Sequence, residues 1–252
     1  AADSPQRTVA ARWQASSPEH APLFAGTAWH FARRLLATLD VPVGIVHLAV
    51  PGTQIEAWLP PPVLRGEFAD LVELHERRRA SPGGEQAPKG VLCGGLWNGM
   101  VAPCAPFAAR GFLWWQGEGN ASQPGTYRAL FPALIGAWRE AFLLPEAPFL
   151  FVELAGFGTR APGPIEDAPW PALRDAQRAA LRLPGTAMVC ALDILDDWTW
   201  EIHPPRKELA GERLHRAAAA LAYGDGMPWS GPQPRAFAFG DGVVRVAFAH
   251  AD

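Results

Sequence analysis

Short apolar runs alternate with helical patterns along most of this chain. Four runs rich in β-branched or aromatic residues predict buried strands, at residues 43–50, 111–115, 148–154 and 187–193. Apolar residues at helical spacing predict four helices, which include residues 31–39, 127–138, 173–181 and 209–221. Strands that alternate with helices are joined by right-handed crossovers, so the pattern predicts an α/β fold with a mainly parallel sheet covered on both faces.

The pattern changes after Tyr223. Residues 236–239 and 243–249 flank Gly240-Asp241-Gly242, which is a strong hairpin signal. We therefore expect one α/β domain over residues 1–229, and the first hairpin of a β-rich accessory module over residues 230–252. Residues 81–90 and 156–169 are rich in proline and glycine and are expected to be loops.

Composition excludes several classes of protein. The net charge is −3 and the pI is near 6.2, so there is no basic field for nucleic acid, and no apolar run is long enough to cross a membrane. Cys93, Cys104 and Cys190 have no metal-site spacing, so we expect neither metal nor cofactor. Cys93 and Cys104 could pair, but free buried thiols are favoured. No signal peptide is visible at the start of the sequence.

Residues able to do chemistry follow the predicted strands. Parallel α/β sheets bind ligands beyond the carboxyl ends of their strands, and residues 52–58, 116–120 and 201–204 occupy such positions. Glycine N–H groups and an asparagine amide can converge on an oxyanion, and a histidine two residues from a carboxylate can act as an oriented general base. Together these residues form a coherent set of candidate site residues.

Five segments in collinear order resemble the sialate O-acetylesterase family, which belongs to the SGNH hydrolase class. They are VPVGIVHLAVPGTQIEAW (41–58), LWNGMVAPCAPFAARG (96–111), GFLWWQGEGNA (111–121), FPALIGAWR (131–139) and EIHPPRKELAGERL (201–214). SGP (230–232) matches the point at which such proteins leave the hydrolase domain. The resemblance implies a flavodoxin-like three-layer sandwich. It also implies a serine-histidine-acid carbohydrate O-acetylesterase, acting without a metal on acetyl esters of sugars such as sialic acid or xylan units.

The resemblance assigns roles to individual residues. His203 would be the general base, and Gly52 and Asn120 would be oxyanion donors. Glu201 stands where the family has an aspartate and is the first choice to orient His203, with Glu118 as the main alternative. Asp193, Asp196 and Asp197 compete for the same role. Pro51 replaces a glycine of the family pattern and removes one N–H donor.

Tryptophans in predicted loops could hold a sugar ring. Trp97, Trp198 and Trp200 lie near the expected strand ends, where an aromatic platform can stack on a pyranose. Trp114 and Trp115 alternate along a strand, so one of them is expected on each face of the sheet.

The nucleophilic serine has no counterpart. The family's serine lies in Gly-Gln-Ser-Asn, directly after an apolar strand. The serines present are Ser4, Ser16, Ser17, Ser81, Ser122 and Ser230, and none follows such a strand. Ser122 lies nearest to Asn120 but suits a turn. The alternatives to a complete esterase are a noncatalytic carbohydrate-binding remnant and one fragment of a two-piece esterase, whose second chain supplies the serine strand. The family would place the protein in the periplasm or outside the cell.

Overall fold

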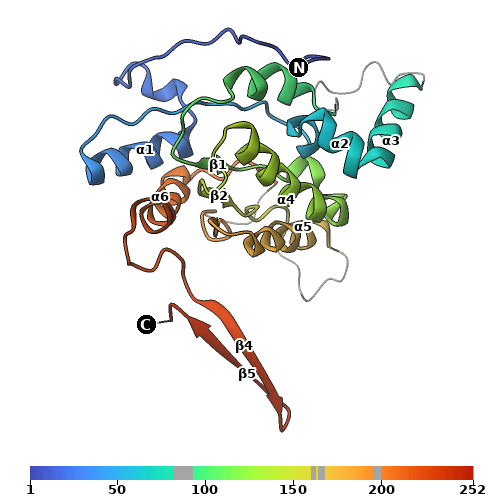
Figure 1. Ribbon diagram of the computed structural model, residues 1–252. Coiled ribbons are helices and arrows are strands. Elements are labelled where there is room, and N and C mark those ends of the chain that lie inside the picture. The colour runs from blue at the N-terminus through green and yellow to red at the C-terminus, as the bar shows by residue number, and fades with distance from the viewer. Residues whose placement is uncertain (82–92, 160–162, 164–167, 196–199, 252) are drawn as a thin grey trace.

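The computed structural model describes residues 1–81, 93–159, 163, 168–195 and 200–251 (Figure 1). Its helices are α1 (Gly26–Leu39), α2 (Pro61–Glu67), α3 (Ala69–Ala80), α4 (Pro124–Ala141), α5 (Pro169–Arg178) and α6 (Lys207–Tyr223). Its strands are β1 (Phe112–Trp114), β2 (Phe149–Val152), β3 (Thr186–Val189), β4 (Gln233–Gly240) and β5 (Val243–Ala249).

A parallel sheet of order β1-β2-β3 forms the centre of the fold. Phe112 is level with Phe149, and Phe149 with Thr186, so the three strands start together. All four residues of β2 and of β3 are buried, as expected for strands covered on both faces. The structure therefore confirms the α/β class and three of the four predicted strands, each shorter than expected.

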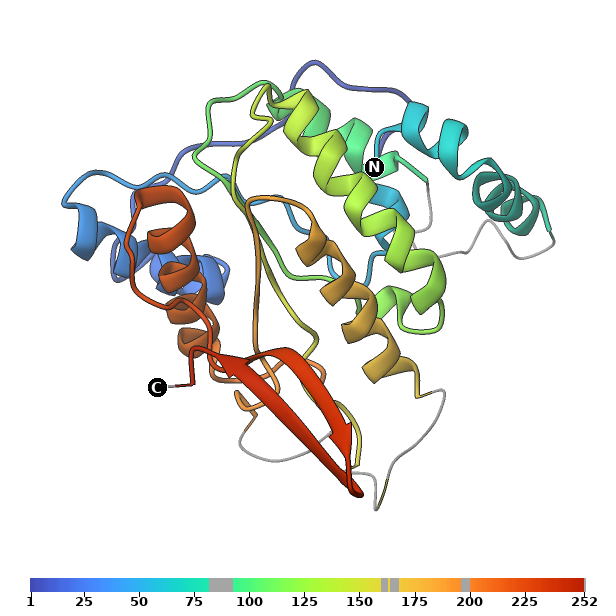
Figure 2. The same cartoon turned by 60° about the horizontal axis from the view of Figure 1, so that its bottom comes forward.

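Helices cover both faces of this sheet. Figure 2 shows α1 and α6 on one side of the strands and α4 and α5 on the other. Side chains alternate along β2, so Leu150 and Val152 pack in the cluster that contains α6, whereas Phe149 and Phe151 pack in the cluster that contains α4 and α5. One strand thus joins two separate hydrophobic clusters.

The layer formed by α1 and α6 depends on a small residue. Gly211 of α6 lies so close to α1 that an added Cβ would meet the Thr27 carbonyl oxygen at 2.9 Å and the His30 Cβ at 2.7 Å. Only glycine allows this approach without displacing a helix. The close contact of α6 with α1 at Gly211 therefore lies within the helix predicted at residues 209–221.

The strand predicted at residues 43–50 is absent. Residues 41–50 are irregular, and the structure gives them no ladder partner within its described ranges. Val41 and Val46 are 49% and 45% exposed, which differs from the expected burial on two faces. The expectation of an adjacent parallel strand over residues 43–50 is therefore wrong, because strand pairing requires a neighbouring edge and this segment has none beside it.

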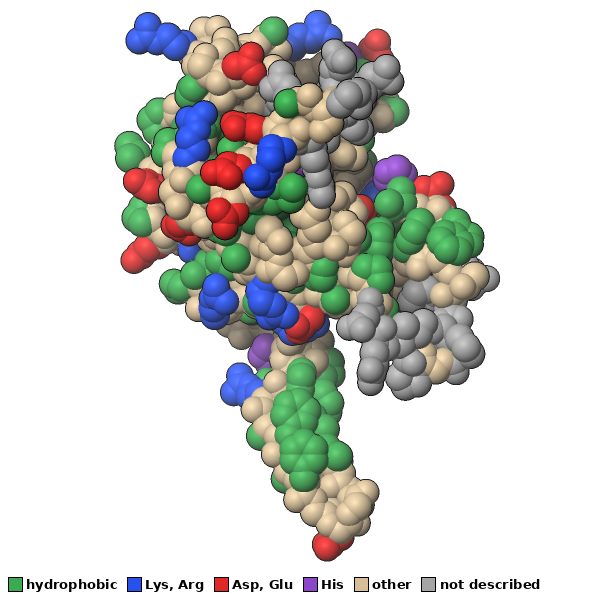
Figure 3. All heavy atoms as spheres, turned by 90° about the vertical axis from the view of Figure 1, so that its right-hand side faces the viewer, with side chains coloured by type: hydrophobic (Ala, Val, Ile, Leu, Met, Phe, Trp, Pro, Cys, Tyr) green, Lys and Arg blue, Asp and Glu red, His purple; other side chains and the backbone are tan. Residues whose placement is uncertain are grey.

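The predicted hairpin is confirmed. β4 and β5 are antiparallel, and Asp241 and Gly242 both have positive φ (51° and 71°), as the tightest hairpin turns require. Phe237, Phe239 and Phe248 are exposed, and Figure 3 shows hydrophobic side chains gathered along the hairpin where it projects from the body. The division into a domain of residues 1–229 and a module of residues 230–252 stays a prediction.

Two further expectations concern loops and membranes. Most of the loop predicted at residues 81–90, and part of that at 156–169, lie outside the described residues. Within the part of the chain that the structure describes, no helix is both long and apolar enough to span a bilayer.

Arg139 joins α4 to the start of two strands and should matter for stability. It is 7% exposed, and its guanidinium donates to the carbonyl oxygens of Ala147, Pro184 and Gly185, which directly precede β2 and β3. We expect Arg139→Met to lower the free energy of unfolding by about 1.5–3 kcal/mol, because hydrogen bonds to a charged group are lost. Urea denaturation followed by tryptophan fluorescence measures this change.

The matched control is Arg128→Met on the same helix. Arg128 makes an exposed ion pair with Asp175, and such pairs contribute about 0–1 kcal/mol. Equal losses in the two variants would contradict the role given to Arg139.

Candidate functional site

The chain segment after β1 and the segment at residues 53–58 meet at the carboxyl end of the sheet. After Trp114 the chain forms a short 3₁₀ turn, Glu118–Asn120, and opposite it lies a second 3₁₀ turn, Ile55–Trp58. Gly119 makes the approach possible, since an added Cβ would lie 3.0 Å from the Thr53 carbonyl oxygen. Two of the three predicted site segments are thus adjacent.

Asn120 is the centre of a buried hydrogen-bond network. Its Oδ1 accepts from the Ile55 N–H at 2.9 Å and from Gln116 Nε2 at 2.8 Å, and its Nδ2 donates to Glu56 Oε2 at 2.9 Å. Gln116 Nε2 also reaches the Thr53 carbonyl oxygen at 3.1 Å. Asn120 is 1% exposed, so these bonds hold it rigidly inside the protein.

Gly52 lies in a different environment from Asn120. It occupies an exposed turn with φ of +70°, and an added Cβ would meet no heavy atom within 4 Å. The next residue, Thr53, belongs to the buried network through the bond from Gln116 Nε2 to its carbonyl oxygen, and Trp58 Nε1 donates to its Oγ1 at 3.0 Å. The proposed oxyanion donors therefore come from two joined segments, one exposed and one buried.

His203 and Glu201 form a pair in the loop before α6. Their atoms Nδ1 and Oε1 are 3.0 Å apart, and the His203 backbone N–H donates to the same Oε1 at 2.8 Å. These two bonds from His203, the backbone bond first, lower the pKa of the Glu201 carboxyl below its ordinary value. Both side chains are exposed (76% and 60%), so the His203 ring is open to a reacting molecule.

Glu118 lies between the two parts of the site. Burial raises the pKa of its carboxyl, while backbone N–H groups and the charges of Lys207 and His203 act in the opposite direction. Lys207 is half-buried with its Nζ 4.2 Å from the centre of the Trp115 ring. Asp193, another predicted partner of His203, instead makes a bidentate ion pair with Arg213 at 2.5 and 2.6 Å. Asp196 and Asp197 lie outside the described residues.

The tryptophans that were predicted to bind a sugar differ in their exposure. Trp97 is 7% exposed and packs in the hydrophobic core, so it offers no open face to a sugar. Trp200 is 71% exposed and meets Phe157 edge-on at 5.3 Å, and Phe157 stacks on Trp170 at 4.8 Å. Trp198 lies outside the described residues. As expected, Trp114 and Trp115 face opposite sides of the sheet.

Sequence reasoning missed several residues here. Phe157 and Trp170 complete the aromatic group around Trp200, and the position of Phe157 just after β2 could have drawn attention to it. Glu56 was read only as part of a motif, although it is 1% exposed and accepts from Asn120. A buried carboxylate cannot be recognised from a segment that alternates apolar and polar residues.

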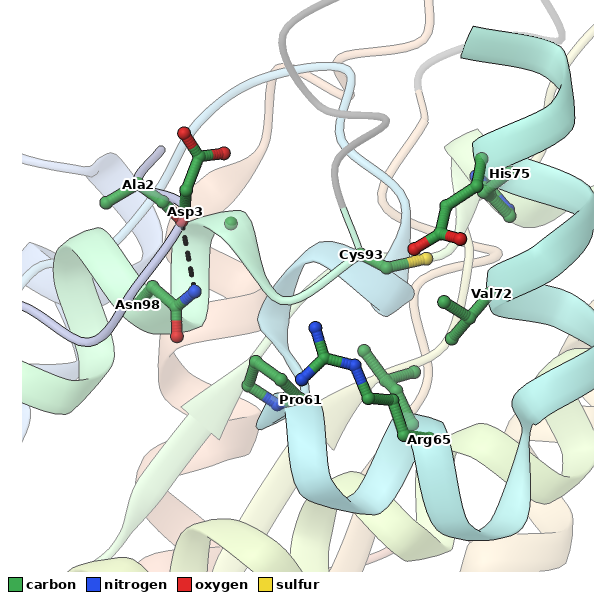
Figure 4. Close-up of a pocket in the computed structure, with 11 residues that line it drawn as sticks. Ala2, Asp3, Pro61, Arg65, Val72, His75, Cys93 and Asn98 are labelled. Atoms are coloured by element: carbon green, nitrogen blue, oxygen red, sulfur yellow. Dashed lines mark hydrogen bonds between the residues drawn. The ribbon is translucent and has the colours of Figure 1, made fainter. Parts of the chain in front are cut away.

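A cavity of about 270 Å³, lined by both polar and apolar residues, lies between His75 and Asn98 (Figure 4). His75 of α3 lines it, is 6% exposed and has its Nε2 3.9 Å from Glu56 Oε1. Across the cavity, Asn98 donates through Nδ2 to the Ala2 carbonyl oxygen at 3.0 Å. Both His75 ring nitrogens and Asn98 Oδ1 have no hydrogen-bond partner among the described atoms, so this cavity suits internal water.

The three cysteines are separate from the site segments described above. All three cysteines are free, and burial raises the pKa of Cys93 and Cys190 to about 11. The expectation that Cys93 and Cys104 are free is confirmed, although both are half-buried rather than fully buried. Where the structure describes the chain, no group of three or more His, Cys, Asp or Glu side chains could hold a metal ion.

Comparisons with known proteins agree with this architecture. The sequence profile of the carbohydrate esterase family described as sialic acid-specific acetylesterase matches residues 10–219. A sialate O-acetylesterase of Rattus norvegicus is 30% identical over 248 residues, which covers 84% of this chain and 45% of the relative. The Homo sapiens protein of the same name is 30% identical over 227 residues, covering 83% and 42%.

Two solved structures are similar. A carbohydrate acetylesterase from Xanthomonas citri has a TM-score of 0.80 and 34% identity, covering 98% of this chain and 52% of that protein. An Arabidopsis thaliana protein has a TM-score of 0.50 and 21% identity, covering 85% and 80%, and shares the fold. The chain spans about half the length of the curated relatives it matches. By its match to the profile over most of its length, the chain belongs to the sialic acid-specific acetylesterase family of carbohydrate esterases.

Proposed function

We propose that this chain forms the larger part of the catalytic domain of a carbohydrate O-acetylesterase, a carboxylic ester hydrolase acting on acetylated sugars. The observation that carries the proposal is the pair His203 and Glu201, with 3.0 Å between Nδ1 and Oε1. An Nδ1–H that donates to Glu201 leaves Nε2 without a proton, so the exposed ring can accept one as a general base.

The nucleophile in this proposal is a serine from outside residues 1–252. In the described part of the chain, no serine hydroxyl hydrogen-bonds to His203. Ser17 pairs with His20 and Ser230 with His250, but Ser17 closes a local turn and Ser230 lies at the base of the hairpin. Ser122 is exposed just after the turn that holds Asn120, and no hydrogen bond joins it to His203 in the described structure.

The proposed reaction uses the His203–Glu201 pair for proton transfer and the Gly52 and Asn120 donors to stabilise the oxyanion. His203 Nε2 takes the serine proton as the serine oxygen attacks the acetyl carbonyl carbon, and the tetrahedral oxyanion forms. His203 then returns the proton to the sugar oxygen, which leaves as an alcohol, and a water repeats the cycle on the acetyl-enzyme. Gly52 N–H and the second N–H of the Asn120 amide are the proposed oxyanion donors.

Trp200 is the proposed sugar platform. It is exposed, and Phe157, which itself stacks on Trp170, meets its ring edge-on. An aromatic face that is fixed by its neighbours can stack on a pyranose without losing much side-chain freedom.

The decisive experiment measures acetate release from O-acetylated sialic acid and acetylated xylose. We expect this chain alone to give background rates, and the chain mixed with a peptide containing an apolar strand followed by Gly-Gln-Ser-Asn to hydrolyse one of the two. Serine-to-alanine peptide should be inactive, and His203→Ala should lower the rate by roughly 10²–10⁴-fold.

Two results would change the proposal. Hydrolysis by the chain alone that survives both Ser122→Ala and His203→Ala would remove the assigned mechanism. Binding of an acetylated sugar by the chain and peptide together, without hydrolysis, would favour a noncatalytic carbohydrate-binding remnant.

The acid partner of His203 can be tested in the same assay. We expect Glu201→Gln to lower the rate far more than Glu118→Gln, because an amide at position 201 cannot stabilise the imidazolium ion. Burial raises the pKa of Glu118, which makes a charged carboxylate there less favourable. The reverse ranking of the two variants would transfer the role to Glu118.

Stability should depend on pH through Glu118. Its pKa in the folded protein lies above the ordinary value of 4.5, so the folded state holds the proton more tightly than the unfolded state. Its contribution is therefore present at low pH and declines as pH rises from 4.5 through the raised pKa. Urea midpoints should show Glu118→Gln gaining stability over the parent as pH rises through this window, with Glu67→Gln, at an exposed site, as the control. Parallel curves for Glu118→Gln and the parent would refute the shift.

A further inference from the structure

An apolar cavity of about 520 Å³ lies between β1 and the extended segment at residues 41–48. Its walls come from both helical layers. Phe31 and Leu35 of α1 and Ala218 of α6 lie on one side, and Trp138 of α4 and Phe142 just after it lie on the other. These are the same two layers that enclose β2, so the cavity occupies the level of the sheet.

One wall of the cavity is the free edge of β1. This strand pairs only with β2 in the described structure. The Phe149 N–H bonds to Gly185 beside β3, so Leu150 is the residue of β2 whose backbone bonds towards β1, at Phe112 and Trp114. The backbone N–H and C=O of Leu113, which alternate with these, therefore point into the cavity.

The opposite wall is the segment that was expected to be a strand. Residues 43–48 line the cavity but have no ladder partner among the described residues. Val46 is 45% exposed and Gly44 and His47 are also exposed, although the sequence of this segment favours a buried strand. Both walls thus offer backbone groups that a strand lying between them would satisfy.

We propose that this groove binds one apolar β-strand, supplied by a polypeptide segment from outside residues 1–252, which pairs with the edge of β1. Both helical layers border the groove, so the strand must carry apolar side chains on both of its faces, as β2 does. Among the lining residues, His47 and Arg110 are the ones with basic side chains, Cys104 is a thiol and no carboxylate is present. Apolar contacts and backbone pairing therefore select the partner, rather than charge.

The direction of the bound strand rests on the proposed function. A strand parallel to β1 would end beside Thr53 and Asn120, where the proposed oxyanion donors lie. The residue directly after the bound strand would then lie beside Thr53 and Asn120, at the carboxyl end of the sheet. Pairing with β1 does not require this direction.

The binding test uses a labelled peptide with a core of about five alternating valines and isoleucines, which is a typical strand length, and lysines at both ends for solubility. We expect saturable binding in fluorescence anisotropy and slower hydrogen exchange at Leu113 and residues 43–48. A peptide with prolines at alternate core positions lacks the pairing N–H groups and should not bind.

Two matched variants locate the binding. Val46→Asp places a carboxylate in the groove at a position that is exposed in the unbound chain, and it should weaken binding at least tenfold without lowering the melting temperature. Val9→Asp, at a position that is 38% exposed and does not line the groove, should leave binding unchanged.

Several outcomes would overturn the proposal. They are equal binding of the strand and proline peptides, unchanged exchange at Leu113, or self-association of the chain that buries the groove and resists the peptide. Absence of binding refutes the groove whatever the esterase assay shows. Binding without hydrolysis, when the peptide ends in Gly-Gln-Ser-Asn, refutes the proposed function but leaves the groove intact.

Discussion

The short strand β2 holds the two halves of the interior together. Each of its four residues is buried, and consecutive side chains enter different hydrophobic clusters. Leu150 and Val152 contact the layer built from α6, and Phe149 and Phe151 contact the layer built from α4 and α5. A strand that serves two clusters must be paired on both edges, because its backbone groups have no access to water. β1 and β3 meet this requirement for β2, but among the described residues β1 itself is paired on one edge only.

The same constraint connects the fold to the site. β1 brings Gln116 and Asn120 to the carboxyl end of the sheet, and their amides bond to the chain at Thr53, Ile55 and Glu56. This network holds residues 53–58 against β1 although the residues before them do not join the sheet. The chain on the far side of the cavity is therefore held at residues 53–56 by polar bonds, whereas residues 43–48 have no strand partner among the described residues.

The candidate catalytic pair is positioned differently from this network. His203 and Glu201 are close in sequence and lie in an exposed loop before α6, and the bonds between them are local. The tight packing of α6 against α1 at Gly211 fixes where that loop ends, but not which groups face the His203 ring. The charges of Lys207 and His203 both lower the pKa of the Glu118 carboxyl, against the larger effect of burial. Glu118 therefore interacts electrostatically with the loop, and it lies in the same 3₁₀ turn as Asn120.

The sequence by itself determined much of this protein. Continuous apolar runs at residues 111–115, 148–154 and 187–193 overlap the three observed strands, and the Gly-Asp-Gly turn identified the hairpin, because both signals are local. The pairing of His203 with Glu201 was also available, since two residues separate them. The tertiary structure alone decided that residues 43–50 stay out of the sheet, that Trp97 is core, and that Glu56 is buried against Asn120. Each of these depends on what lies opposite in space, and a residue pattern specifies the strand-forming tendency of a segment but not the presence of its partner.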